Sequence, residues 1–186
     1  MERKIIVAVD EGEESSYALS WSLNNIFCSS NDTLILLCAK PARTVYPYVD
    51  ETGRPRDLLL RQGYLFSQDI VESMERYVNE VAESVVRKAK KVCQDYPQIK
   101  VEIKVETGDA RDVICEAAEK LNADMVVLGS HGYGALKRAF LGSVSNHCAQ
   151  NIKCPVLIVK RPKIPSPTSP HAAAAAAAGT AGGKQE

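Results

Sequence analysis

The sequence predicts an open, mostly parallel α/β sheet with helices on both faces. Short continuous apolar runs rich in β-branched residues recur along the chain, and such runs are typical of strands buried on both faces. The segments between them carry apolar residues at helical spacing. Because strand and helix alternate throughout, each strand is connected to the next by a helical crossover, which favours a parallel sheet. A length of 186 residues, 45% hydrophobic and 25% charged, is ordinary for one such domain.

The first elements follow from their residue types. Residues 4–9 form a continuous apolar run, which predicts a buried strand. Ser15 and Ser16 are candidates for the N-cap of the helix that follows. Residues 33–39 predict a second buried strand, which the nearby Pro41 ends.

The middle of the chain predicts a loop, a long helix and an outer strand. Residues 42–63 mix prolines, tyrosines and charges without a period, which is typical of a long surface loop. An amphipathic helix is expected at about residues 66–94, with its apolar stripe in the core. Residues 99–105 alternate strictly between polar and apolar, which indicates a strand with one face in water.

The last elements complete one domain at residues 1–162. Gly108 and Asp109 lead into a further helix, and residues 124–128 and 155–159 predict two more strands. From residue 163 the chain is rich in Pro, Ser and Ala. Residues 163–186 lack the apolar bulk of a core, so we expect a disordered tail, with docking to a partner as the alternative.

Composition excludes several classes of protein. The formal net charge is zero, which argues against a general nucleic-acid binder. No stretch approaches the roughly 20 apolar residues of a membrane span, and Asp10 ends the first apolar run too early for a signal peptide. We therefore expect a cytoplasmic protein without membrane insertion, with the nucleus, reached by diffusion, as the alternative location. The six cysteines form no CxxC pair and no zinc spacing, so we expect reduced thiols, a redox role for one of them being the alternative.

A glycine-punctuated segment near the C-terminus carries the strongest functional signal. The apolar strand that ends at Leu128 runs into Gly129 and Gly132, and Gly142 then opens the last helix at Ser143. Glycine permits close approach of a ligand to the main chain as well as positive φ, and a helix N-terminus presents unpaired N–H groups and partial positive charge. This arrangement predicts a phosphate site and points to nucleotides as ligands.

Residues from the first two strands should join this segment. Asp10, Ala39 and Gly129 each lie just beyond the C-terminal end of a predicted strand. Ligands of open α/β sheets bind in a crevice outside these strand ends. The three residues are therefore expected in one crevice.

The sequence at this point resembles the universal stress protein family. Gly129-x-x-Gly132, nine further residues and Gly142-Ser143 are similar to the ATP-binding signature of that family. The first strand and loop around Val7–Asp10 and the last strand after Cys154 resemble the family's two ends, so the likeness covers about residues 3–161. The layout looks most like that of single-domain plant members. The resemblance implies a five-stranded Rossmann-like sheet of order 3-2-1-4-5 and a homodimer formed through the last strand.

The resemblance also implies a ligand and a role for each site residue. The ligand would be ATP or AMP, with Mg²⁺ as an accessory to the triphosphate, in a stress response. Phosphates would be held by Gly132, Gly142, Ser143 and the Val144 amide. Asp10 would hold ribose hydroxyls or help to hold a metal ion, Ala39 would meet adenine through its backbone, and Leu128 and Gly129 would line the nucleoside side. Gly12 departs from the family, which commonly has serine there.

Simpler interpretations of these residues remain open. The glycines could serve only turns and tight helix–sheet packing, and Asp10 could only cap the entry to a helix. His131 could be a solvated loop residue or could reach a phosphate. Lys137 and Arg138 could neutralise phosphate or face solvent.

Three functions are compatible with the sequence. The first is a regulatory module that binds adenine nucleotide. The second is a slow ATP hydrolase or phosphotransferase, for which His131 and Asp10 are the available acid–base groups, although the Walker A motif is absent. The third is a dimeric interaction scaffold that acts without nucleotide.

Overall fold

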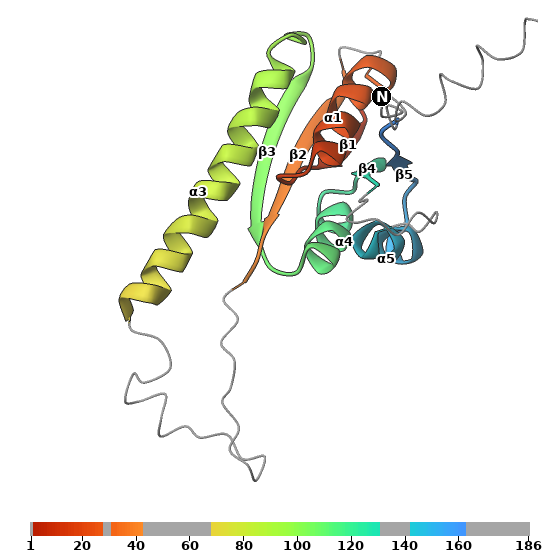
Figure 1. Ribbon diagram of the computed structural model, residues 1–186. Coiled ribbons are helices and arrows are strands. Elements are labelled where there is room, and N and C mark those ends of the chain that lie inside the picture. Colours follow the sequence, from red (N-terminus) through yellow and green to blue (C-terminus); the bar gives the residue numbers. More distant parts are fainter. Residues whose placement is uncertain (1, 28–30, 43–67, 131–141, 163–186) are drawn as a thin grey trace, which may run out of the picture.

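The computed structural model describes residues 2–27, 31–42, 68–130 and 142–162. Its centre is a five-stranded sheet of order β3-β2-β1-β4-β5 in which every neighbouring pair is parallel, as predicted (Figure 1). The strands are β1 (Lys4–Ala8), β2 (Thr33–Lys40), β3 (Lys100–Thr107), β4 (Met125–Gly129) and β5 (Val156–Val159). The helices are α1 (Glu13–Asn25), α3 (Gln68–Cys93), α4 (Ala110–Lys120) and α5 (Ser143–Asn151).

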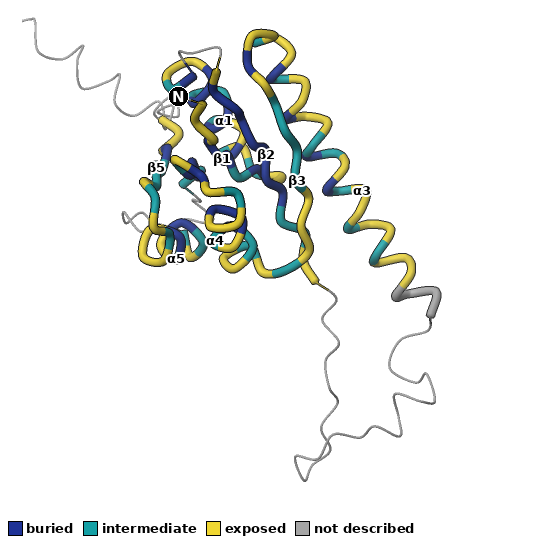
Figure 2. The backbone as a smooth tube through the Cα atoms, turned by 180° about the vertical axis from the view of Figure 1, so that it is seen from behind, coloured by how far each residue is buried: buried dark blue, intermediate teal, exposed yellow. Residues whose placement is uncertain are grey.

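The sheet separates two apolar layers. Helices α1 and α3 pack on one face, where Ile5 and Val7 of β1 are fully buried. Helices α4 and α5 pack on the other face, where Ile6 is fully buried. Successive residues of a strand point to opposite faces, so a central strand covered on both sides has to be apolar at every position. Figure 2 shows the central strands as the buried part of the chain, with the exposed residues mainly on the helices.

Two predicted N-caps are wrong. Helix α1 begins at Glu13 with Gly12 as its N-cap, so Ser15 and Ser16 lie inside its first turns. Gly12 has extended backbone angles, and its carbonyl accepts a hydrogen bond from the Ser16 N–H at 3.3 Å. Two acidic residues in the first turn complement the helix dipole. At α4 the predicted entry to the helix is confirmed, and Asp109 is its N-cap. The Asp109 side chain accepts a hydrogen bond from the Arg111 N–H at 2.9 Å.

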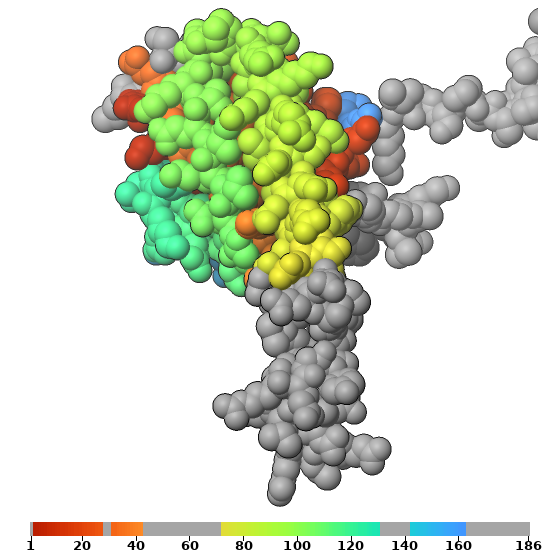
Figure 3. All heavy atoms as spheres, turned by 90° about the vertical axis from the view of Figure 1, so that its left-hand side faces the viewer, coloured from red at the N-terminus to blue at the C-terminus, as the bar shows by residue number. Residues whose placement is uncertain are grey.

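Helix α3 extends beyond the sheet that it covers. Its 26 residues span about 39 Å, whereas the eight residues of β2 span about 26 Å. Val85 and Ala89 are buried as expected, but Met74 and Tyr77 are 62% and 65% exposed, so the prediction that the whole stripe is core is wrong for these two. Figure 3 shows the first part of α3 in full view on the face that it forms with β3.

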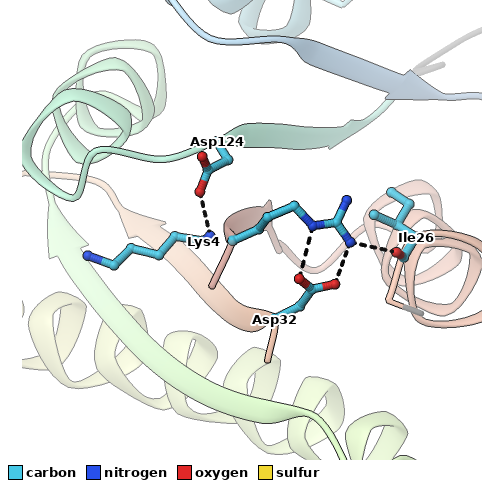
Figure 4. A network of polar contacts seen from close by, with 5 residues as sticks. Lys4, Ile26, Asp32 and Asp124 are labelled. Carbon is cyan, nitrogen blue, oxygen red and sulfur yellow. Dashed lines mark hydrogen bonds and ion pairs between the residues drawn. The ribbon is translucent and has the colours of Figure 1, made fainter. Parts of the chain in front are cut away.

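The amino ends of the strands are held together by polar contacts (Figure 4). Arg3 donates from Nε and Nη2 to the two carboxylate oxygens of Asp32, at 2.9 and 2.5 Å. The Lys4 N–H donates to Asp124 Oδ2 at 2.7 Å, which connects β1 to the start of β4. These contacts set the strand positions at the amino ends of the strands, opposite to their carboxyl ends.

Some expectations fall on residues outside the described ranges. They concern loop residues 43–63, Cys28, Gly132, His131, Lys137, Arg138 and the tail at 163–186. The other five cysteines are free thiols. Among the described helices, none has the length and apolarity needed to cross a membrane.

Candidate functional site

The carboxyl ends of the central strands surround a cavity of about 200 Å³. Its walls come from β1, β2 and β4 and from the first turns of α1, α4 and α5. Every predicted site residue within the described ranges lines this cavity: Asp10, Ala39, Leu128, Gly129, Gly142, Ser143 and Val144. The topology thus brings together residues that are more than 130 positions apart in the chain, as expected for strand ends of a parallel sheet.

Asp10 is held by the loop that leads into α1. Its carboxylate Oδ1 accepts one hydrogen bond from the Gly12 N–H at 2.8 Å and one from the Ser15 hydroxyl at 2.5 Å. Asp10 does organise the entry to the helix, although the N-cap itself is Gly12. Asp10 is also exposed and lines the cavity, so its role at the helix entry does not bury it.

Gly129 is required by close packing. A Cβ placed on this residue would lie 2.7 Å from the carbonyl carbon of Glu14 and 2.8 Å from the Ser15 nitrogen. Gly129 therefore does serve tight helix–sheet packing, and it also lines the cavity. The expected positive φ is not found at Gly129 or Gly142; among the described glycines it occurs at Gly108. Gly129 allows the first turn of α1 to lie directly against the end of β4.

The N-terminus of α5 opens onto the same cavity. Gly142 is its N-cap, with φ of −57° and ψ of 157°, and among the described residues no side-chain cap is found at this end. The first turn contains no acidic residue, and its first residue, Ser143, is exposed. The first N–H groups of a helix have no partner within the helix and carry partial positive charge. This end of the cavity therefore suits an anion.

Ser145 connects the two glycine-containing walls. It is 3% exposed, and its hydroxyl donates to the Gly129 carbonyl oxygen at 3.2 Å. This bond ties the first turn of α5 to the end of β4. Ser15 and Ser145 are cavity residues that were not among the predicted site residues. Each is the third residue of a helix that follows a strand, which is the signal that the sequence offered.

A second cavity of about 210 Å³ adjoins the first, and Asp10 and Ala39 line both. Its other wall is the middle of α3, from Tyr77 to Val85. Cys38 also lines it; burial and, to a lesser degree, the Asp10 carboxylate raise the pKa of its thiol, so Cys38 is protonated at neutral pH. This part of α3 was predicted to lie in the core, and its contribution to the wall of the second cavity was not predicted.

The acidic groups at the site are few. Within the described parts of the chain, no three His, Cys, Asp or Glu side chains are grouped so as to hold a metal ion. Asp10 is the carboxylate shared by the two cavities, and Glu11 lines the second. His131, the predicted acid–base partner of Asp10, lies outside the described residues, as do Gly132, Lys137 and Arg138.

Solved structures share this architecture. The hypothetical protein MJ0577 aligns over 87% of this chain and 98% of its own with a TM-score of 0.64 at 23% identity. A universal stress protein family protein from Arabidopsis thaliana with AMP bound aligns over 91% and 98% with a TM-score of 0.57 at 22% identity. A universal stress protein in complex with cAMP aligns over 84% and 96% with a TM-score of 0.56 at 23% identity.

Sequence comparison gives the family. The universal stress protein PHOS32 of Arabidopsis thaliana is 30% identical over 86% of this chain, and PHOS34 of the same plant is 30% identical over 86%. The matches span 65% and 62% of the lengths of these two relatives. The model of the universal stress protein family matches residues 1–160, which include the whole described sheet and the strand-end cavity. The chain therefore belongs to the universal stress protein family.

Proposed function

We propose that this protein is a regulatory module of a stress response that binds ATP or AMP in the strand-end cavity. The observation that carries the proposal is that Asp10 and the N-terminus of α5 line one cavity. A carboxylate and a helix N-terminus are complementary to the two polar ends of a nucleotide, its ribose diol and its phosphate. Two family members of the same fold carry AMP and cAMP, which supports an adenine nucleotide as the ligand.

The phosphates lie at α5 in this proposal. The Ser143 and Val144 amides and the Ser143 hydroxyl donate to them, and Gly142 leaves room for their close approach. Gly132 adds a further contact from the segment before α5. Because the first turn of α5 has no acidic residue, no carboxylate there opposes a bound phosphate.

The nucleoside lies toward β1, β2 and β4. Asp10 accepts hydrogen bonds from ribose hydroxyls, Leu128 and Gly129 line this part of the cavity, and adenine meets the backbone of Ala39. Mg²⁺ is commonly held by one or two carboxylates together with substrate phosphates. Asp10 would supply such a carboxylate, and the ion would neutralise phosphate charge when ATP is bound.

Calorimetric titration with ATP, AMP, adenosine and GTP tests the proposal. ATP and AMP should bind, and adenosine should bind at least about tenfold more weakly because it lacks the charge-assisted phosphate contacts. Gly142→Val should abolish the advantage of AMP over adenosine, since valine tolerates the backbone angles of this residue but fills space beside the phosphate. Ala149→Val, on an exposed position of the same helix, is the matched control. Absence of binding by the unmodified protein would refute the proposal.

We also propose a homodimer formed through β5, in the cytoplasm. In the described structure β5 pairs with β4 on one side and forms the edge of the sheet on the other. An apolar edge strand such as this one requires a cover. The carbonyls of Pro155 and Val159 accept hydrogen bonds from Val126 of β4 and from Ser130 just beyond it. By strand alternation the N–H and C=O of Ile158 therefore point to the open edge.

Substitutions at Ile158 test the open edge of β5 without removing its hydrogen bonds to β4. Ile158→Pro should give a monomer in light scattering because it removes an outward donor, while the bonds to β4 are kept. Ile158→Val keeps the donor and should remain dimeric. A monomeric unmodified protein at micromolar concentration would contradict the proposed dimer.

A further inference from the structure

We infer that Ser15 is a positioning residue that orients the Asp10 carboxylate for the ribose hydroxyls of the bound nucleotide. The inference rests on the proposed function and extends it to a residue with no role assigned there. Ser15 is 4% exposed although it is polar, and it lines the strand-end cavity. A buried hydroxyl in the first turn of a helix needs a partner, and its closest partner is Asp10.

The Ser15 hydroxyl contacts both parts of Asp10. Its Oγ lies 2.5 Å from Asp10 Oδ1 and 3.1 Å from the Asp10 backbone nitrogen, which donates to it. Its other acceptors are farther away, the Gly12 carbonyl at 3.0 Å and the Asp10 carbonyl at 3.2 Å. Because a hydroxyl has one hydrogen and a charged acceptor binds it more strongly, the hydrogen goes to the carboxylate. One side chain therefore fixes Asp10 at its main chain and at its carboxylate.

This arrangement fixes one oxygen of the Asp10 carboxylate. Oδ1 accepts hydrogen bonds from the Gly12 N–H and from the Ser15 hydroxyl. Both donors come from the loop and the first turn of α1. The carboxylate is thus held in one orientation before the ligand arrives, which lowers the ordering cost of binding a diol.

The position of Ser15 depends in turn on Gly129. The Ser15 nitrogen would lie 2.8 Å from a Cβ at Gly129, so the turn that carries Ser15 reaches the cavity only because β4 ends in glycine. Gly129, Ser15 and Asp10 form a chain of contacts from β4 through α1 to the end of β1. Gly12 has no side chain, and Ser15 supplies the hydroxyl beside Asp10.

The next residue provides a matched control. Ser16 is also in the first turns of α1 and bonds to the same Gly12 carbonyl, at 3.2 Å, but it is exposed and is not a cavity residue. Ser15→Ala and Ser16→Ala therefore each remove one hydroxyl from the same helix, and only the first removes a donor to Asp10.

The experiment measures the affinities of AMP and of 2′,3′-dideoxy-AMP by calorimetry on the full chain. The unmodified protein should prefer AMP by at least about tenfold, as hydrogen bonds to a charged group are strong. Ser15→Ala should reduce this preference to below about threefold and leave the affinity for the dideoxy nucleotide within about twofold. Ser16→Ala should keep the full preference. An equal loss for both nucleotides would show a merely structural role and overturn the inference.

A pair of isosteric substitutions keeps the test valid if the alanine variant folds poorly. Thr and Val add the same methyl group to position 15 and differ in the hydroxyl. Ser15→Thr should retain the preference for AMP, and Ser15→Val should lose it. If Ser15→Ala or Ser15→Val kept the full preference for AMP, the inference about Ser15 would be wrong and the proposed function would stand. Failure of the unmodified protein to bind either nucleotide would instead refute the proposed function. Equal affinity of the unmodified protein for AMP and the dideoxy nucleotide would show that Asp10 does not bind the ribose hydroxyls, and would overturn the inference.

Discussion

Gly129 at the end of β4 lies against Glu14 in the first turn of α1, so close that a Cβ at Gly129 would be 2.7 Å from the Glu14 carbonyl carbon. The contact joins two residues that are 115 positions apart in the chain. It also places the helix turn that holds Asp10 beside the strand end that opens the cavity. The close packing at Gly129 therefore also determines the geometry of the candidate site.

Gly129→Ala should destabilise the protein by about 1–3 kcal/mol, because the added methyl meets backbone atoms that cannot move aside independently. Urea unfolding measures this change. The neighbouring Ser130→Ala should change stability by less than about 0.5 kcal/mol, because it removes only a hydroxyl from a half-buried residue. Equal stability of the Gly129 variant and the unmodified protein would show that α1 is free to shift.

Ser143→Glu should change stability and ligand affinity in opposite directions. A carboxylate in the first turn of α5 complements the helix dipole, so the protein should be more stable by about 0.3–1 kcal/mol. The same charge opposes phosphate and should weaken AMP binding at least about tenfold. Thermal unfolding and calorimetry on one preparation measure both effects. Ser143→Gln, which lacks the charge, is the control. Unchanged AMP affinity in the glutamate variant would show that the phosphates do not bind at the N-terminus of α5.

Arg3→Ala should destabilise the fold by about 2 kcal/mol. Asp32 is 1% exposed, and the substitution removes the guanidinium that neutralises its buried carboxylate. The cost is below that of a fully buried pair because the Arg3 side chain is 44% exposed.

The Lys120–Glu116 pair offers an exposed comparison. Both side chains are more than 60% exposed, so Glu116→Gln should change the free energy of unfolding by less than about 0.5 kcal/mol. Chemical denaturation of both variants gives the comparison. Similar costs for the two pairs would show that the burial of Asp32 is not what makes its contact important.

Stability should fall on the alkaline side of pH 9. Burial raises the pKa of Cys148 to about 12 and that of Cys93 to about 11, from an ordinary value of 9.0. Between pH 9 and 11 the unfolded chain therefore releases thiol protons that the native protein retains, and the free energy of unfolding decreases as pH rises. This contribution is fully present below pH 9 and is lost as pH rises through the folded-state pKa values.

Variants without the thiols isolate this effect from the other groups that titrate in the same range. Cys93→Ala and Cys148→Ala should each show a shallower loss of stability between pH 9 and 11 in urea unfolding. The comparison of slopes removes any constant cost of the substitution itself. Slopes parallel to that of the unmodified protein would mean that these thiols ionise as readily in the native state as in the unfolded chain.

Much of the fold was predictable because its signals are local. The continuous apolar runs of β1, β2 and β4 indicate strands buried on both faces, and the alternation of residues 99–105 indicates the outer strand β3. The strand order followed from the resemblance to the family. Once strand ends are known, the rule that ligands bind beyond them brings Asp10, Ala39 and Gly129 together, and the structure has them around one cavity.

Features that depend on distant neighbours were not predictable in this way. Ser15 has the residue type of an N-cap, but the close approach of β4 at Gly129 and the hydrogen bonds of Asp10 place it inside α1 as a buried cavity residue. Tyr77 continues an apolar stripe, yet α3 is longer than the sheet, so its side chain is mostly exposed.

The sequence by itself determined which segments become strands and helices and which residues follow the strand ends, because periodicity and residue type act within a few positions. Only the tertiary structure decided which of those residues touch: Ser15 with Asp10, Glu14 with Gly129, and Ser145 with the Gly129 carbonyl. Such contacts join elements that are remote in the chain or depend on where a helix begins, and they are set by how closely the helices pack on the sheet.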